Sequence, residues 1–325
     1  SEKLPPFAHS YLLTSVLNSD YVDADSIKGP SKGDLGGYLR FDYRKIDNYK
    51  WRNPVNENEA FFDEGLNADK GDDKANFIYG EKELWYVNTI SSKNHIAVFY
   101  TSGRSDGKSV NGRHGGLPAG VPDSLAMQKL DSIKLYTLPD YEADPINAVP
   151  IKTVHFEYDY SLCQGYDQNN DTGTLGGKLT LKKVYMTYEK SQRGRHSVYE
   201  FNYGYNPNYD IKSVDRWGNY KPKPASCTND ILTTDLRPSD FPYVGYDKAN
   251  VDQLAGSWAL TSINLPSGGR IEVDYESDDY AYVQHKKAGQ MFKIAGIRYS
   301  DGTYVGFTNF GTKEKITRLV AIYWR

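Results

Sequence analysis

Residues 260–275 read LTSINLPSGGRIEVDY, and this stretch decides the fold. Side chains alternate along an extended strand, so Ile263 and Leu265 share one side of a first strand. By the same rule, Ile271 and Val273 share one side of a second strand. The PSGG between them supplies a proline with a fixed φ and glycines that accept a positive φ, as a short hairpin loop requires. The stretch therefore predicts a β-hairpin.

The alternation contains one irregularity, because Leu260 lies three residues before Ile263 instead of two or four. The same slip recurs along the chain, and each slip is followed by a second alternating run that usually ends in tyrosine. The slips lie at residues 84–87, 130–133, 181–184, 260–263 and 294–297, and the second runs lie at 96–100, 154–158, 199–203, 271–275 and 303–307.

Each copy is interpreted as a strand that begins with a bulge or turn, which shifts the side-chain parity, and then pairs with the next strand. The connectors differ greatly in length, which argues against a propeller or a strict solenoid. We therefore predict an all-β fold: an extended antiparallel sheet of successive hairpins, in a single domain covering residues 1–325. Long loops are expected at 53–76 and 102–124 and within 215–258, with at most one or two short helices, one of them near 250–256.

Composition supports this class of fold. The 28 tyrosines outnumber the leucines, and tyrosine suits a half-buried pleated surface. The 29 glycines and 15 prolines count against long helices. The net charge of −3 comes from interspersed charges, 39 basic and 42 acidic, so no nucleic-acid partner is predicted. No apolar run approaches the length of a membrane-spanning helix, so no membrane span is predicted.

The hairpin unit at 260–275 resembles the YD-repeats of RHS proteins, in which a short strand pair ends in tyrosine. Four longer pieces, FAHSYLLTSVLNSDYVD (7–23), YGEKELWYVNTI (79–90), IKTVHFEYDYSLC (151–163) and DRWGNYKP (215–222), are similar to segments of very long RHS-like surface proteins of Bacteroidota. The resemblance implies a secreted or cell-surface part of a larger polypeptide, whose sheets spiral into a hollow shell around a toxin or other cargo. The acidic DPxG segment at which such shells cleave themselves is absent, since Asp144 begins DPIN, so self-proteolysis is not expected.

Two acidic segments are candidates for a calcium site. In DQNNDTG, oxygen side chains alternate at Asp167, Asn169 and Asp171, as at the start of a calcium-binding loop. The glycine comes one place late and Lys178 stands where a closing glutamate would be, so a solvated turn is the alternative. In DYVDAD, the carboxylates of Asp20, Asp23 and Asp25 could gather a cation, with an ordinary turn again as the alternative.

The segment DRWGNY offers a candidate ligand-binding site. Asp215, Arg216, Trp217 and Tyr220 combine two aromatic rings with polar side chains, as in sugar-binding platforms and protein hot spots. The alternative is a buried tryptophan that anchors a long connector.

Other residue types give weaker indications of chemistry. Glu276, Asp278 and Asp279 could supply the paired carboxylates of a glycosidase, but acidic residues are also common in turns. Cys163 and Cys227 form either one disulfide or two independent buried thiols. The histidines lack the spacing of a metal-ligand pair; they are His9, His95, His114, His155, His196 and His285.

From these observations we expect a structural or interaction module of a secreted or cell-surface RHS-like protein, located outside the cell. Its expected partners are other segments of the same large polypeptide or a protein cargo, and glycans are a further possibility. No cofactor is expected apart from calcium. The alternative is a carbohydrate-binding module or a glycoside hydrolase that uses paired carboxylates.

Overall fold

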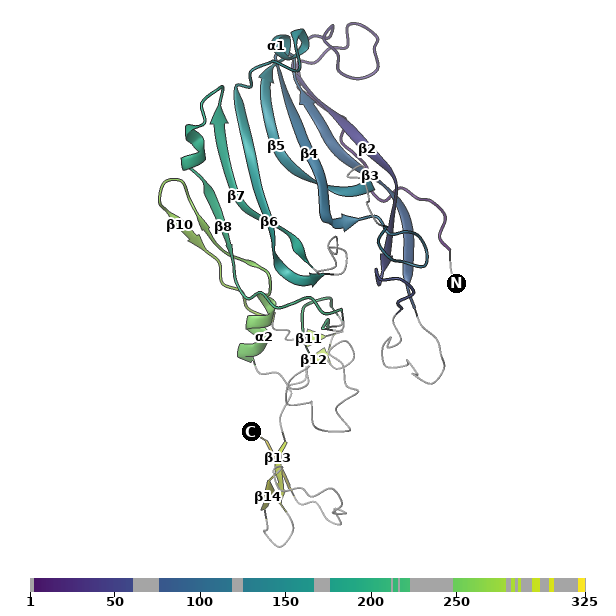
Figure 1. Cartoon of the computed structure of the whole chain (residues 1–325), viewed down its shortest axis with the longest axis vertical. Helices are drawn as coiled ribbons and strands as arrows, with labels where there is room; N and C mark the ends of the chain where they lie inside the picture. Colours follow the sequence, from purple (N-terminus) through teal and green to yellow (C-terminus); the bar gives the residue numbers. More distant parts are fainter. Residues whose placement is uncertain are drawn as a thin grey trace.

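The computed structural model describes residues 3–60, 76–118, 125–166, 176–211, 213–215, 217–222 and 248–278, and five short strands beyond them. Ten strands form one antiparallel sheet in which each strand lies beside its neighbours in the sequence. Figure 1 shows these strands as one strongly curved layer, with α1 at one end of it. The predicted fold class, an all-β sheet of successive hairpins with two short helices, is confirmed.

The sheet contains β1 to β10, and the remaining short strands form one two-stranded and one three-stranded sheet. The ten strands are β1 (Ser15–Leu17), β2 (Tyr38–Asn53), β3 (Ile78–Ser91), β4 (His95–Lys108), β5 (Ala126–Thr137), β6 (Lys152–Tyr166), β7 (Gly176–Tyr188), β8 (Tyr199–Tyr203), β9 (Leu260–Asn264) and β10 (Arg270–Glu272). The helices are α1 (Leu138–Ala143), the 3-10 helix η2 (Arg193–His196) and α2 (Lys248–Ala255). The short strands are β11 (Tyr282–Val283), β12 (Lys286–Lys287), β13 (Ile294–Arg298), β14 (Tyr304–Gly306) and β15 (Ala321–Trp324).

The hairpin expected at 260–275 is present as β9 and β10. Ile263 lies opposite Ile271 in the antiparallel pair. In the loop, the Leu265 N–H donates to the Gly269 carbonyl at 2.8 Å, and Gly268 has a φ of +85°, the positive value that the turn requires. The local turn chemistry therefore fixes this hairpin.

The parity slips are β-bulges. A register shift leaves one extra residue at Asp131 in β5, at Lys182 in β7 and at Thr261 in β9, each inside a predicted slip. In β13 the shift lies between Ile294 and Gly296, again inside a predicted slip. In β3 the extra residue is Asn88, one residue beyond the slip predicted at 84–87, so that position was wrong by one residue.

A tyrosine hydroxyl closes each of four hairpins at the point where its backbone ladder ends. In the β5–β6 pair the ladder ends at Ser132, and two residues further the carbonyl of Leu130 accepts the Tyr158 hydroxyl at 2.9 Å. The equivalent contacts are Tyr43 to Leu13 at 2.7 Å, Tyr203 to Leu181 at 2.7 Å and Tyr275 to Leu260 at 2.9 Å. These tyrosine–carbonyl contacts explain the tyrosine that ends the second run at 154–158, 199–203 and 271–275.

The same tyrosines also connect consecutive hairpins. Tyr158 lies opposite Leu181 across the β6–β7 pair, and Tyr203 lies opposite Leu260 across the β8–β9 pair. Each of these tyrosines therefore donates its hydroxyl within its own hairpin and meets the first strand of the next hairpin through its backbone. The register of one hairpin thereby sets the register of the next.

With this register, one side of the sheet is apolar along its whole width. Residues directly opposite each other in antiparallel strands share a face, as do residues two apart along a strand. We call this side the apolar face and define it by three rows of paired residues: Phe41, Ile90, Ala97 and Leu135; Phe99, Ile133, Val154 and Met186; and Phe201, Ile263 and Ile271.

The other side of the sheet is largely polar. One row across it consists of Glu157, Lys183, Glu200, Asn264 and Arg270. At the α1 end this side holds the small hydrophobic core of the sheet, in which Leu138 of α1 covers Ile96, Val98 and Tyr136. Thr137 caps α1 by accepting the Asp140 N–H on its hydroxyl, and Pro139 lies in the first turn.

Part of the loop predicted at 102–124 is wrong, because β4 continues as a strand to Lys108. The prediction followed the polar, glycine-rich composition, but tertiary contacts hold these residues in the extended conformation. The Asp106 carboxylate accepts the Leu179 N–H of β7 at 2.9 Å, and the Ser105 N–H donates to the Tyr160 hydroxyl at 3.0 Å. The long strand β2 was also not predicted. The helix expected near 250–256 is confirmed as α2.

The helices of the described residues are all too short or too polar to cross a lipid bilayer.

Replacing Tyr158 by phenylalanine removes only the hydroxyl that closes the β5–β6 hairpin. We expect Tyr158→Phe to lower the free energy of unfolding by about 1–2 kcal/mol, because the Leu130 carbonyl loses its partner. The measurement is urea unfolding followed by circular dichroism. Tyr188→Phe is the control, since Tyr188 is exposed and is expected to change the value by less than about 0.5 kcal/mol. Equal effects of the two substitutions would contradict the role given to the hydroxyl.

Candidate functional site

The DRWGNY segment is a tight turn organised by Asp215. The Asp215 carboxylate accepts the backbone N–H groups of Trp217 and Asn219, both at 2.9 Å. Gly218 has a φ of +89° at the tip, and Val214 is bridged to Tyr220 at the base. Asp215 therefore has a structural role in this turn, which holds the neighbouring aromatic residues in fixed positions.

The two aromatic residues of this turn have different environments. Trp217 is 56% exposed at the tip, so the alternative in which it is buried in a connector is wrong. The Tyr220 ring packs edge-on against Trp258 at a centroid distance of 4.8 Å, and Trp258 donates its indole N–H to the Pro207 carbonyl at 2.7 Å. Tyr220 is therefore the anchor of the turn, whereas Trp217 is exposed at its tip. Arg216 lies outside the described residues.

The calcium candidates are only partly described. Asp167, Asn169 and Asp171 lie outside the described residues. Among the described residues, Asp23 and Asp25 do approach each other, but their third neighbour is Asp34, and the three offer carboxylate oxygens within 4.8 Å of one another. Asp20 instead accepts the Gly37 N–H at 3.1 Å. Asp34 was not predicted, because it is distant from Asp23 and Asp25 in the sequence and approaches them only in the folded loop.

Hydrogen bonds within the loop account for the position of the Asp34 carboxylate. It accepts the Ala24 N–H at 3.0 Å, the Ser31 N–H at 2.8 Å and the Tyr21 hydroxyl at 2.8 Å. The bond from Ala24 contributes most to holding the pKa of Asp34 below its usual 3.8, and the bond to Asp34 raises the pKa of Tyr21 to about 12. Asp34 therefore stabilises the loop between β1 and β2 through these hydrogen bonds. Calcium binding at this cluster stays a prediction.

The carboxylates considered for hydrolysis are poorly placed for it. Glu276 and Asp278 are exposed on either side of Ser277, which donates its N–H and hydroxyl to Asp252, both at 2.9 Å. A glycosidase acid depends on an enclosed, apolar environment, which an exposed carboxylate lacks. Asp279 lies outside the described residues. The exposed positions give no support to the hydrolase alternative.

The cysteine and histidine candidates make no assembled site in the described residues. Cys163 is a free, buried thiol, and burial raises its pKa. Cys227 lies outside the described residues, so the disulfide stays a prediction. His155 stacks on Tyr185 at a centroid distance of 4.6 Å and its Nε2 lies 2.9 Å from the Thr187 hydroxyl, which is a structural environment. His285 lies outside the described residues.

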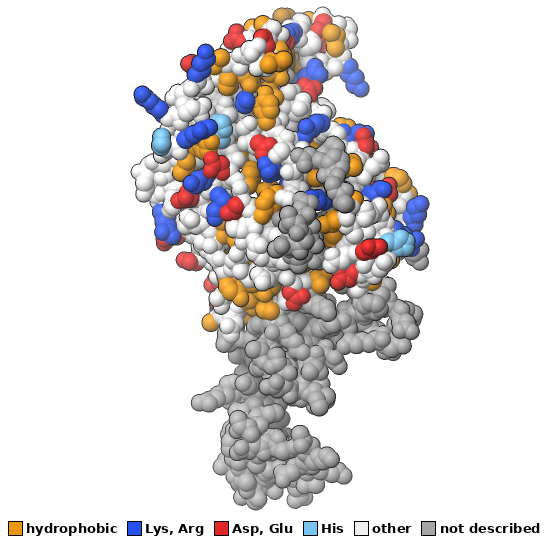
Figure 2. Space-filling view, viewed as in Figure 1, with side chains coloured by type: hydrophobic (Ala, Val, Ile, Leu, Met, Phe, Trp, Pro, Cys, Tyr) orange, Lys and Arg blue, Asp and Glu red, His pale blue; other side chains and the backbone are white. Residues whose placement is uncertain are grey.

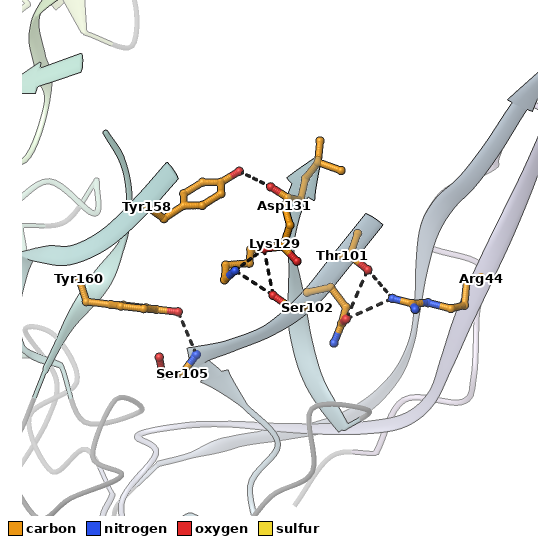
Figure 3. A network of polar contacts seen from close by, with 10 residues as sticks. Arg44, Thr101, Ser102, Ser105, Lys129, Asp131, Tyr158 and Tyr160 are labelled. Carbon is orange, nitrogen blue, oxygen red and sulfur yellow. Dashed lines mark hydrogen bonds and ion pairs between the residues drawn. The ribbon is translucent and has the colours of Figure 1, made fainter. Parts of the chain in front are cut away.

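A network of polar side chains crosses the middle of the sheet and was not predicted. Arg44 of β2 donates to Thr101 of β4 and, at 3.1 Å, to Gln128 of β5. Beside it, Lys129 pairs with Asp131 and donates to Ser102 at 2.8 Å. Figure 3 shows these groups pointing toward one another, with Tyr158 and Tyr160 reaching in from β6. The donors and acceptors satisfy one another, so this network stabilises the sheet.

One ion pair extends this network toward the end of β4. Arg104 pairs in a bidentate manner with Asp106, at 3.0 Å and 2.8 Å. Asp106 is 3% exposed and also accepts the Leu179 N–H of β7. The hydrogen bond to Asp106 is the main cause that raises the pKa of Arg104. The hydrogen bond from Leu179 to Asp106 joins β7 to β4, which are not neighbours in the sheet, and thereby stabilises the curvature. Arg104 holds the Asp106 carboxylate in place for this bond.

The apolar face lacks a structural explanation within the described residues. None of its defining residues is fully buried, and Ile271 is 48% exposed. By contrast, the residues that α1 covers on the other side, such as Ile96 and Tyr136, are 8% and 3% exposed. Contiguous apolar surface of this kind usually marks a site of protein interaction. No protein-family model, curated protein or solved structure matches the chain, so its function is inferred from its own residues.

The low pKa of Asp34 makes one part of the stability depend on pH. A carboxyl whose pKa is lower in the folded than in the unfolded chain stabilises the fold at pH values above its pKa in the unfolded chain, near 3.8. This contribution is lost as the pH falls through the pKa of the folded chain. We expect Asp34→Asn to be less stable than the natural chain near neutral pH, and this difference to shrink as the pH is lowered below 3.8.

The measurement is the urea midpoint of both proteins over a pH series. Asp274→Asn, at an exposed position, is the control and is expected to show no such convergence. A difference between the natural chain and Asp34→Asn that is independent of pH would contradict the role of the Asp34 carboxylate.

Proposed function

We propose that the chain is an interaction module of a secreted or cell-surface RHS-like protein, and that its apolar face holds a polypeptide cargo. The observation that carries this proposal is the apolar face, whose defining residues are all at least partly exposed and which continues across the sheet from β2 to β10. Each Å² of apolar surface that a partner removes from water contributes about 25 cal/mol, so covering rows of such side chains favours association.

The architecture supports a role within a larger polypeptide. The sheet is a single layer, and β1 and β10 are its two edge strands. Edge strands present backbone groups to which further strands can add. Additional hairpins of the same kind would extend the curved wall, and the apolar face would extend with it. A cargo held against such a wall is recognised by its apolar side chains and not by a specific sequence.

A test uses fluorescein-labelled β-casein, an unfolded polypeptide with apolar segments, and measures fluorescence anisotropy. Val184 lies two residues before Met186 and therefore on the apolar face. The double variant Val154→Thr and Val184→Thr keeps the shape of both side chains and replaces one methyl group of each by a hydroxyl. We expect it to weaken binding about tenfold, since a methyl-sized apolar group contributes about 0.8 kcal/mol.

The matched control changes the other side of the same two strands, with Glu157→Gln and Lys183→Gln. These residues lie opposite each other on the polar side, so binding is expected to be unchanged. Absence of binding to the natural chain, or an equal loss in both double variants, would contradict the proposal.

A second candidate function is glycan binding, and the exposure of Trp217 favours it. Its ring stands at the tip of a turn that Asp215 fixes, an arrangement suited to stacking on a sugar.

A glycan array with the natural chain and Trp217→Ala tests this function. Saturable binding that falls at least about fivefold in Trp217→Ala is the expected result if the turn binds sugar. Trp85→Ala is the control, because Trp85 is also exposed but lies on β3. Binding that neither substitution changes would exclude Trp217 as the sugar-binding residue.

A further inference from the structure

The connection between β7 and β8 carries a concentration of positive charge on a chain whose net charge is −3. Residues 189–197 read EKSQRGRHS. This stretch contains one carboxylate, that of Glu189, and four basic residues: Lys190, Arg193, Arg195 and His196. All four of these basic residues are exposed. We call this set the basic loop.

The loop is held rigidly against the sheet. The Ser191 N–H donates to the Tyr188 carbonyl at 2.9 Å, and the Ser197 N–H donates to the Gly194 carbonyl at 3.0 Å. At Gly194 an added Cβ would lie 1.7 Å from the Met186 carbonyl oxygen, so η2 packs directly on the backbone of β7. In a 3-10 helix, residues three apart lie one above the other, which puts Arg193 and His196 on one side of η2.

The cations of the loop have no acidic partner in the part of the chain that the structure describes, where no ion pair joins Lys190, Arg193 or Arg195 to a carboxylate. Exposed cations without partners repel one another, and an anionic ligand would relieve that repulsion.

The positive surface extends from the loop onto the sheet. Burial lowers the pKa of His155, and the charges of Arg195 and Lys134 lower it further, so both cations lie near this histidine. Lys152 lies opposite Tyr188 in the β6–β7 pair, next to the start of the loop. Figure 2 shows Lys, Arg and His side chains gathered at the edge of the molecule where Figure 1 places β7 and β8.

Two exposed aromatic rings flank the basic loop. The chain leaves β7 after Tyr188, which is 55% exposed, and enters β8 at Tyr199, which is 36% exposed. Tyrosine rings stack on sugar rings, and cations pair with sulfate or carboxylate groups. We propose that the basic loop, together with Tyr188 and Tyr199, binds an acidic polysaccharide. This site adjoins the apolar face, because Tyr188 lies two residues beyond Met186 and Tyr199 lies two residues before Phe201, but it is separate from Trp217.

The test measures binding of fluorescein-labelled heparin and of polygalacturonate to the whole chain at low salt. The variant Arg193→Gln with Arg195→Gln removes two exposed charges and leaves the backbone of η2 unchanged. A cation near an anionic surface contributes about 1 kcal/mol, or about fivefold in affinity, so we expect a loss of about 25-fold. Binding by the natural chain should also weaken steeply as the salt concentration rises.

The matched control is Lys28→Gln with Lys93→Gln, which removes the same charge from exposed positions outside the basic loop. It should change the affinity less than about twofold. Tyr188→Ala tests the sugar contact: it should weaken polysaccharide binding about fivefold and leave binding of duplex DNA unchanged.

The proposal is overturned if neither polysaccharide binds, if the control loses as much affinity as the arginine variant, or if duplex DNA binds as tightly as both polysaccharides. The last result would indicate a general attraction of negative charge to this surface.

Discussion

The structure depends on one constraint, which is the register that bulges and tyrosine hydroxyls impose on successive hairpins. In β5, the extra residue Asp131 shifts the side-chain parity just where the ladder to β6 ends. The Tyr158 hydroxyl then binds the Leu130 carbonyl, which would otherwise lack a strand partner in β6. A slip of one residue would move every side chain of a strand to the opposite face. The tyrosine contact opposes such a slip because it holds for only one register.

The separation of the two faces follows from this register. Because each hairpin passes its register to the next, apolar residues as distant as Phe41 in β2 and Ile271 in β10 lie on the same side of the sheet. Bulges also increase the local twist, which makes a sheet of this width curve instead of lying flat. The hydrogen bond from Leu179 of β7 to Asp106 of β4 stabilises the curvature, and Arg104 holds the Asp106 carboxylate in place. A curved single layer with one apolar face is suited to holding something against that face.

The fold could be predicted from the sequence where its determinants are local. The hairpin at 260–275 follows from PSGG and from alternation, and the bulges at Asp131, Lys182 and Thr261 follow from three-residue slips in the same alternation. The continuation of β4 beyond Ser102 could not be predicted in this way. Its glycines and polar residues favour a loop, and contacts between distant residues, such as Asp106 with Leu179 and Ser105 with Tyr160, hold them in a strand.

The candidate sites show the same division between local and distant determinants. The tight turn around Asp215 is local chemistry, but sequence could not decide between a buried and an exposed Trp217. Asp34 joins Asp23 and Asp25 only through the folded loop. The basic loop at 189–197 is visible in the sequence as a cluster of charge, but its packing on β7 and its lack of acidic partners are properties of the structure.

Disulfide trapping across β6 and β7 tests the bulged register most directly. With Lys182 as the extra residue, Asp159 lies opposite Thr180, whereas continuous pairing from Glu157 and Lys183 would place Asp159 opposite Leu181. In a background that lacks Cys163 and Cys227, Asp159→Cys with Thr180→Cys should oxidise rapidly to an intramolecular disulfide, and Asp159→Cys with Leu181→Cys should not. Preferential closure of the second pair would contradict the register on which the two faces of the sheet depend.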